Sequence, residues 1–210
     1  MIRITNMYFY YNKMFSIIQV ERRIKMIIGV CGKSGSGKST LAEYLKKHYG
    51  ENTIHVDVDK IGHKATEDNA VRDGLVSEFG EEILTDNKVD RKKLRKIVFA
   101  RKEDMDTLTK YTWEYMREEI KRILEQSEGK IIILDWLLLP ITEFFEACDM
   151  TILLDVPYST RIKRVLKRDG ITEEEFALRD SAAPEYDKTR FQVVLENTDE
   201  NTLRKLGKIL

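Results

Sequence analysis

Apolar residues in this chain gather in short runs of strand length, separated by segments with helical spacing. The runs that predict strands span 26–31, 52–59, 130–135, 150–156 and 191–197. Continuous apolar runs are typical of parallel strands that are covered on both faces. After the first run, residues 41–49 show helical spacing that ends at Gly50, a common helix terminator. The pattern predicts an α/β fold, with a parallel sheet of about five strands and helices on both faces.

The segment 66–127 has a different pattern, because it is highly charged, mostly helical in spacing and without a strong strand. A long helical stretch between two strands of a parallel sheet predicts an inserted lobe. A basic helix over 159–168 is followed by a turn and a second helix, so we expect 158–183 to form a lid. Residues 26–210 are therefore expected to be one domain that carries an inserted helical lobe over 66–127 and a lid.

The first 25 residues differ from the rest. Residues 1–13 are aromatic, lack a clear period and have no small-residue cleavage site of a signal peptide. Residues 21–25 could be encoded by a bacterial ribosome-binding sequence and its spacer. We therefore expect Met26 to be the true start of the protein. The alternative is a short N-terminal helix or arm on the surface.

A glycine-rich loop follows the first predicted strand and fits the phosphate-binding pattern G-x-x-x-x-G-K-[ST]. The residues expected to bind a nucleotide there are Gly32, Lys33, Ser34, Gly35, Ser36, Gly37, Lys38, Ser39 and Thr40. Gly35 and Gly37 allow backbone conformations in which successive N–H groups face a phosphate. Lys38 brings positive charge to the outer phosphates, and the Ser39 hydroxyl is placed to hold Mg²⁺. The following helix directs the positive end of its dipole at the same anion.

Three carboxylates fall at the ends of predicted strands, where parallel sheets bind their ligands: Asp57, Asp59 and Asp135. One carboxylate can accept the proton of an acceptor hydroxyl, and another can hold Mg²⁺ directly or through water. We expect Asp59, with Asp57, to serve as the base and Asp135 to serve as the metal ligand. The alternative for each is helix capping or turn formation.

The basic helix places Arg161, Arg164 and Arg168 on nearly one face. Arginine side chains match phosphate oxygens and can stabilise charge on a transferring phosphoryl group. We expect Arg164 and Arg168 to close over the phosphates. The other charges of this helix are interpreted as a solvated face.

Composition restricts the partners. The 36 basic and 36 acidic residues cancel, so there is no global electrostatic reason to expect nucleic acid or an anionic membrane as a partner. No stretch is long and apolar enough to span a bilayer. Cys31 and Cys148 are expected to be small core residues in a reducing compartment, the cytoplasm. The pattern leaves the oligomeric state open.

From Met26 onward, the chain resembles the dephospho-coenzyme A kinases, within the wider group of P-loop nucleoside and nucleotide kinases. The matching segments are 28–40, 55–61, 79–84, 90–99, 134–135 and 167–175. Within these, segment 91–99 is the most specific, because it belongs to the helical substrate lobe of the family, which corresponds to 66–127 here. The resemblance implies a three-layer P-loop kinase fold and transfer of a phosphoryl group from ATP to the ribose 3′-hydroxyl of dephospho-CoA. It also implies that Asn197 lies near the adenine.

The chain departs from the family pattern on the expected acceptor side, at His63, Trp113, Glu114, Trp136, Leu137 and Ala183. The two tryptophans are read either as stacking partners of an acceptor or as packing residues. These departures leave a nucleoside or nucleotide kinase and a non-catalytic ATP-binding regulator as alternatives. A GTPase is a further alternative, because 59–62 and 87–90 mimic the motifs D-x-x-G and N-K-x-D.

Overall fold

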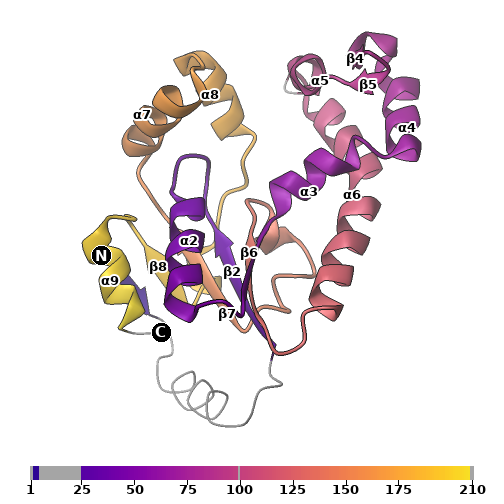
Figure 1. The fold of residues 1–210 in the computed structure, drawn as a ribbon. Helices are drawn as coiled ribbons and strands as arrows, with labels where there is room; N and C mark the ends of the chain where they lie inside the picture. Colours follow the sequence, from indigo (N-terminus) through magenta and orange to yellow (C-terminus); the bar gives the residue numbers. More distant parts are fainter. Residues whose placement is uncertain (1, 5–24, 99, 209–210) are drawn as a thin grey trace. The chain divides into compact units, whose positions relative to one another are not determined.

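The computed structural model describes residues 2–4, 25–98 and 100–208, and the chain divides into two compact units. The first unit contains Met1–Val56 and Ser127–Leu210, and the second contains Asp57–Gln126. In the described part of the chain, the first unit carries a six-stranded sheet in the order β1-β8-β7-β2-β6-β3 (Figure 1).

The strands of this sheet are β1 (Ile2–Ile4), β2 (Met26–Cys31), β3 (Thr53–Asp57), β6 (Ile131–Asp135), β7 (Met150–Leu154) and β8 (Val193–Leu195). Strand β2 pairs in parallel with β6 and β7, and β7 pairs in parallel with β8. Strand β1 is antiparallel to β8 and adds an edge strand that the sequence pattern did not predict. The predicted α/β fold with a mostly parallel sheet is confirmed.

The order of the strands places the glycine-rich loop at the topological switch point. Strand β2 lies between β6 and β7: the chain runs from β2 to β3 on one side of it, and later passes from β6 to β7 on its other side. In such sheets, ligands bind beyond the carboxyl end of the central strand. The loop that follows β2 therefore occupies the expected ligand position.

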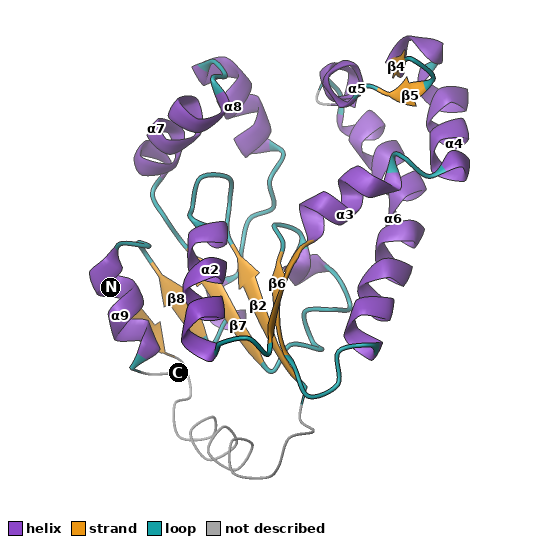
Figure 2. Ribbon diagram, in the orientation of Figure 1, coloured by secondary structure: helices purple, strands orange, loops and turns teal. Residues whose placement is uncertain are grey.

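Helices α2 (Lys38–Tyr49) and α9 (Glu200–Gly207) cover one face of the sheet in the first unit (Figure 2). Their apolar side chains and those of β2, including Ile28 and Val30, share one buried core. The opposite face is covered by the segment that contains the short helix η2 (Leu139–Ile141). A Cβ at Gly29 would lie 2.7 Å from Leu139 Cδ2 and 2.9 Å from Cys148 Sγ, which shows how closely this segment packs.

Two helices follow β7 in the predicted lid region, α7 (Tyr158–Asp169) and α8 (Glu173–Ser181). Helix α7 ends at Gly170, whose φ of +64° suits glycine. Helix α8 begins with a capping box between Thr172 and Glu175. The short helix η3 (Lys188–Arg190) then leads to β8. Local signals in the sequence thus set the end of α7 and the start of α8.

The second unit contains α3 (Val58–Ala65), α4 (Asn69–Phe79), η1 (Glu81–Ile83), the strands β4 (Leu84–Thr85) and β5 (Lys88–Val89), α5 (Arg91–Val98) and α6 (Lys102–Glu125). It has its own apolar core, made by Val71, Leu75, Ile83, Leu94 and Val98. The predicted lobe was 66–127, whereas this unit begins at Asp57 and includes α3. The hairpin of β4 and β5 was not predicted.

Two remaining expectations concern membranes and the N-terminus. No helix in the described part of the chain is long and apolar enough to cross a membrane. The predicted extension 1–25 lies outside the described residues except for β1 and Lys25, so the expected start at Met26 stays a prediction.

Candidate active site at the glycine-rich loop

Backbone conformation and space both require glycine at two positions of the loop. Gly35 has a φ of +79° and Gly37 a φ of +97°, in the region that side chains disfavour. A Cβ at Gly35 would lie 2.6 Å from the Arg161 carbonyl oxygen. A Cβ at Gly37 would lie 2.4 Å from the Thr198 hydroxyl oxygen. Neighbouring elements therefore pack directly against the loop and fix its shape.

The N-terminus of α2 is left open to an anion. Its N-cap is Gly37, which has no side chain to bind the first N–H groups, and its first turn holds no acidic residue. The N–H groups of a first helical turn carry partial positive charge and suit a phosphate. Lys38 is the first residue of this helix, and Ser39 and Thr40 follow it. The polarity expected of a phosphate site is therefore present.

The two predicted magnesium ligands lie together. Asp135 is the last residue of β6, is buried, and its Oδ2 accepts a hydrogen bond from Ser39 Oγ at 3.5 Å. Because the Ser39 hydroxyl donates its proton to Asp135, its lone pairs remain available to a cation. Among the described residues, no three His, Cys, Asp or Glu side chains gather as a metal site. Magnesium suits such a small protein ligand set, because it keeps several waters and binds substrate phosphates.

The sequence interpretation missed His55, which also contacts Asp135. His55 Nε2 lies 3.3 Å from Asp135 Oδ2, and Nδ1 lies 3.9 Å from Glu43 Oε1. The imidazole is largely buried, with 14% of its side chain exposed. A signal for it was available in the sequence, because His55 stands between Ile54 and Val56 in a predicted strand.

Arg161 is a buried structural residue, which contradicts its interpretation as part of a solvated face. Its Nε donates to the Val156 carbonyl at 2.9 Å, and its guanidinium binds both carboxylate oxygens of Asp180. Its Nη1 also donates to the Ser34 carbonyl of the loop at 3.4 Å. The residue therefore joins α7, α8 and the loop.

Arg164 lies beside the loop and binds its carbonyl groups. Its Nη1 donates to the Gly35 oxygen at 3.2 Å and to the Ser36 oxygen at 3.3 Å. Its Nη2 donates to Asn197 Oδ1 at 3.3 Å. The structure thus brings Arg164 and Asn197 together with the loop, at its carbonyl groups.

Arg168 and Lys33 are held by acidic neighbours. Arg168 Nε lies 2.6 Å from Asp169 Oδ1, and this hydrogen bond is the main cause of the lowered pKa of Asp169. Lys33 Nζ lies 2.5 Å from Glu185 Oε1, on the segment that follows α8. The expected contact of Arg168 with phosphates stays a prediction.

The predicted strand end at Asp59 is wrong. Strand β3 ends at Asp57, which is the N-cap of α3, so Asp59 lies in the first turn of that helix. Asp57 Oδ1 accepts the Lys60 N–H at 3.3 Å, and Oδ2 pairs with Lys60 Nζ at 3.2 Å. The capping alternative therefore describes Asp57. Both carboxylates belong to the second unit, and Asp59 is exposed.

His63, one of the departures from the family pattern, lies near charges of both signs. Burial and the positive charge of Arg91 lower its pKa, and the negative charge of Asp59 opposes this shift. The imidazole is therefore less easily protonated than a free histidine.

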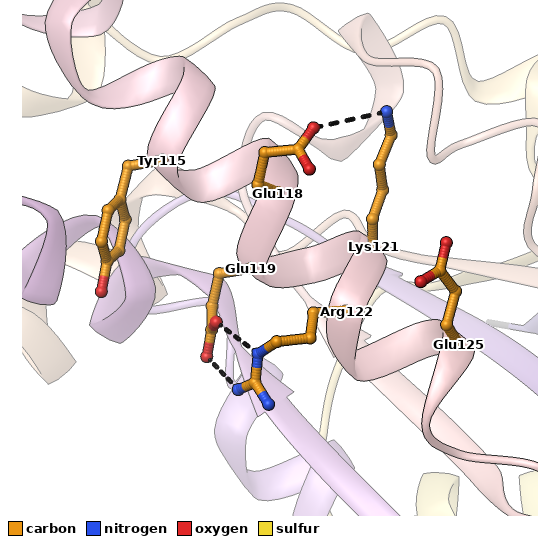
Figure 3. A pocket seen from close by; sticks show the side chains of 6 residues that line it. All are labelled: Tyr115, Glu118, Glu119, Lys121, Arg122 and Glu125. Carbon is orange, nitrogen blue, oxygen red and sulfur yellow. Dashed lines mark hydrogen bonds and ion pairs between the residues drawn. The ribbon is translucent and has the colours of Figure 1, made fainter.

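A hollow of about 400 Å³ lies along α6 and contains none of the predicted site residues (Figure 3). It is lined by Tyr115, Glu118, Glu119, Lys121, Arg122 and Glu125. Arg122 binds Glu119 at 2.7 Å, and this pairing is the main cause of the lowered pKa of Glu119. Lys121 lies 3.6 Å from Glu118. The lining therefore carries charges of both signs, and two of its three carboxylates are paired with basic neighbours on the same helix.

The residues of the GTPase-like motif 87–90 have local structural roles. Asn87 occupies the turn of the β4–β5 hairpin with a φ of +59°, and Asp90 accepts N–H groups at the start of α5. Such turn and cap positions favour Asn and Asp on their own account. The motif therefore gives no support to a GTPase.

Trp136 and the two cysteines are packing residues. Trp136 is 3% exposed, so it offers no face to a base. Both thiols are free; burial raises the pKa of Cys31 far above its usual range and that of Cys148 to about 12. Neither thiol is a nucleophile near neutral pH.

The strand order, the uncapped helix after a glycine-rich loop and the Ser39–Asp135 pair define a phosphotransferase of the P-loop kinase class. The family model of the dephospho-CoA kinases matches residues 26–202. The chain belongs to the dephospho-CoA kinase family.

Individual relatives agree with this assignment. The dephospho-CoA kinase of Fusobacterium nucleatum is 34% identical over 189 residues, which cover 87% of this chain and 96% of the relative. The dephospho-CoA kinase of Carboxydothermus hydrogenoformans is 32% identical over a match that covers 88% of this chain and 92% of that relative. The crystal structure of TT1252 from Thermus thermophilus has a TM-score of 0.72 at 28% identity, and the match covers 88% of this chain and 95% of that one.

Proposed function

We propose that this protein transfers the γ-phosphoryl group of ATP to the ribose 3′-hydroxyl of dephospho-CoA. Family membership supports this reaction, and so does the glycine-rich loop at the switch point of the sheet. The single observation that carries the donor half is the Ser39–Asp135 pair beside the open N-terminus of α2. We propose the second unit, Asp57–Gln126, as the acceptor lobe and 158–183 as the lid.

On the donor side, the loop N–H groups and Lys38 would bind the phosphates of ATP. Ser39 and Asp135 fit Mg²⁺, because both offer oxygen ligands and lie within reach of one ion. When bound, Mg²⁺ would neutralise charge on the outer phosphates. Asn197 would lie on the nucleotide side of the loop, as the family resemblance implies.

On the acceptor side, Asp59 would orient the hydroxyl and accept its proton. Both oxygens of Asp57 already bind Lys60, so Asp57 is proposed to support the start of α3. Arg164 would hold the loop, and Arg168 would close over the transferring group. The pair between Arg168 and Asp169 is exposed, and exposed pairs contribute about 0–1 kcal/mol, so a phosphate can displace Asp169.

We also propose a cytoplasmic location, because the free thiols of Cys31 and Cys148 suit a reducing compartment.

The acceptor is tested by measuring ADP release with dephospho-CoA, nucleosides and nucleoside monophosphates as separate substrates. We expect turnover with dephospho-CoA and a product that carries phosphate on the 3′-oxygen. Turnover with a nucleoside and none with dephospho-CoA would replace our assignment of the acceptor. Tight ATP binding without turnover of any acceptor would favour a regulator.

The base is tested by Asp59→Asn, with Asp106→Asn as a matched control on an exposed residue of α6. Loss of a positioned base typically lowers the rate by about 10²–10⁴-fold. We expect that loss in kcat for Asp59→Asn, unchanged ATP binding, and wild-type kinetics for the control. A wild-type kcat for Asp59→Asn would show that another group accepts the proton.

A further inference from the structure

Asp135 is a buried carboxylate that receives hydrogen bonds from two side chains at the same oxygen. It is 4% exposed, and its Oδ2 is approached by Ser39 Oγ at 3.5 Å and by His55 Nε2 at 3.3 Å. A buried charge is costly unless it is hydrogen-bonded. A carboxylate with one donor can still rotate about its last bond, whereas two donors from different elements restrict it. Ser39 comes from α2 and His55 from β3.

The direction of the His55 hydrogen bond follows from chemistry. An ionised carboxylate only accepts hydrogen bonds, so Nε2 must carry the proton that points at Asp135. Nε2 is therefore the donor atom and Asp135 Oδ2 the acceptor atom in this contact.

The other side of the ring is also constrained. Nδ1 lies 3.9 Å from Glu43 Oε1, which is too far for a direct hydrogen bond but within reach of one bridging water. Only 14% of the His55 side chain is exposed, so the surrounding residues limit its rotation. The imidazole ring thus lies between Glu43 of α2 and Asp135 of β6.

We propose that His55 is a positioning residue that holds Asp135 in the orientation required to bind the nucleotide-associated divalent cation. This inference rests on the proposed role of Ser39 and Asp135 as magnesium ligands. Mutation of a residue that hydrogen-bonds to a metal ligand typically weakens metal binding by about 10–100-fold. His55 contributes to binding of the cation and leaves metal-free nucleotide binding unchanged.

The test measures binding of Mn²⁺, which like Mg²⁺ prefers oxygen ligands, to the full-length protein saturated with ADP. The free Mn²⁺ signal in electron paramagnetic resonance reports this binding without any turnover. The variants are His55→Leu, which removes the donor, and His55→Gln, which retains an N–H donor near the position of Nε2. His55→Asn also introduces an amide N–H donor, but the asparagine side chain is too short to bring this donor to Asp135. His48→Leu is the matched control, because His48 is exposed and about 13 Å further along α2 than Ser39.

We expect Mn²⁺ to bind about 10-fold more weakly to His55→Leu and His55→Asn, and within about 3-fold of wild type to His55→Gln and His48→Leu. ADP affinity in EDTA should be equal in all variants. If His55→Leu does not fold, the test is the comparison of Mn²⁺ affinity between His55→Gln and His55→Asn. Wild-type Mn²⁺ affinity in His55→Asn would overturn the inference, and so would equal losses in both amide variants or a parallel loss of ADP affinity in EDTA.

These results separate this inference from the assignment of the acceptor. If the wild-type ADP complex binds no Mn²⁺, the proposed metal site and the role of His55 both fail. If it binds Mn²⁺ but the enzyme does not phosphorylate dephospho-CoA, the proposed acceptor fails and the role of His55 is still decided by the variants.

Discussion

Replacing Arg161 by methionine removes one half of an ion pair that joins α7 to α8. The side chain of Arg161 is 7% exposed and that of Asp180 is 14% exposed, so neither charge is well solvated. Breaking a buried pair typically costs about 3–5 kcal/mol, because the remaining charge has no partner. The variant also loses the hydrogen bond to the Val156 carbonyl, which contributes about 1 kcal/mol. We therefore expect Arg161→Met to lower the free energy of unfolding by about 4 kcal/mol.

The assay is urea unfolding of four proteins: wild type, Arg161→Met, Asp180→Leu and the double variant. Replacing both partners leaves no isolated charge, so the double variant should lose only about 1–2 kcal/mol and be more stable than either single variant. Additive losses, or a loss below about 1 kcal/mol for Arg161→Met, would refute the reasoning.

The same variants report on the loop, because Arg161 also donates to the Ser34 carbonyl. Loss of one such hydrogen bond, about 1 kcal/mol, should raise the KM for ATP about 5-fold. Lys163→Met is the control, since Lys163 is an exposed basic residue of the same helix and should leave stability and KM unchanged.

Three further outcomes follow from the structure. Gly37→Ala should weaken ATP binding at least about 10-fold, because its Cβ would lie 2.4 Å from Thr198 Oγ1. Gly50→Ala is the control: its φ is +81° and its Cβ would meet open space, so it should change stability and leave ATP binding unchanged. Equal ATP affinity in the two variants would contradict this prediction. The Cys148 thiol, whose pKa is raised to about 12, should react with iodoacetamide at about pH 8 only after denaturation; rapid alkylation of the native protein, followed by mass spectrometry, would contradict this raised pKa. His63 has a lowered pKa in the fold, so its contribution to stability is full above about pH 6.5 and is lost as the pH falls through that lowered pKa; urea midpoints of His63→Gln should therefore fall less than those of wild type between about pH 7.5 and about pH 5.5, and parallel curves would disprove it.

Elements whose stability depends on local pattern were predictable from the sequence. The apolar runs at 26–31 and 130–135 correspond to β2 and β6, and the loop was recognised from its glycines and lysine. These signals are local, because a buried parallel strand must be apolar and a phosphate loop must contain glycine. The predicted end of β3 was wrong because its local signal is ambiguous. An aspartate such as Asp57 can end a strand or cap a helix, and the neighbouring residues do not distinguish these two roles.

Features that depend on contacts between distant segments were not predictable. Arg161 is basic and stands in a basic helix, so its burial follows only from Asp180, which lies on the next helix. His55 is separated by 80 positions from Asp135, and only the neighbouring positions of β3 and β6 in the sheet bring them together. A sequence pattern reports the environment of a residue along its own element and leaves its partners on other elements unspecified.

The arginines of α7 explain how the loop keeps its N–H groups available. In a trans peptide unit, the C=O and the N–H point in opposite directions. Arg161 binds the carbonyl of Ser34, and Arg164 binds that of Ser36. Fixing these two carbonyls on the α7 side turns the N–H groups of Gly35 and Gly37 away from α7, so they remain available to an anion. Helix α7 therefore orients the backbone of the glycine-rich loop through two of its arginines, which is a role that needs no contact between these side chains and a phosphate.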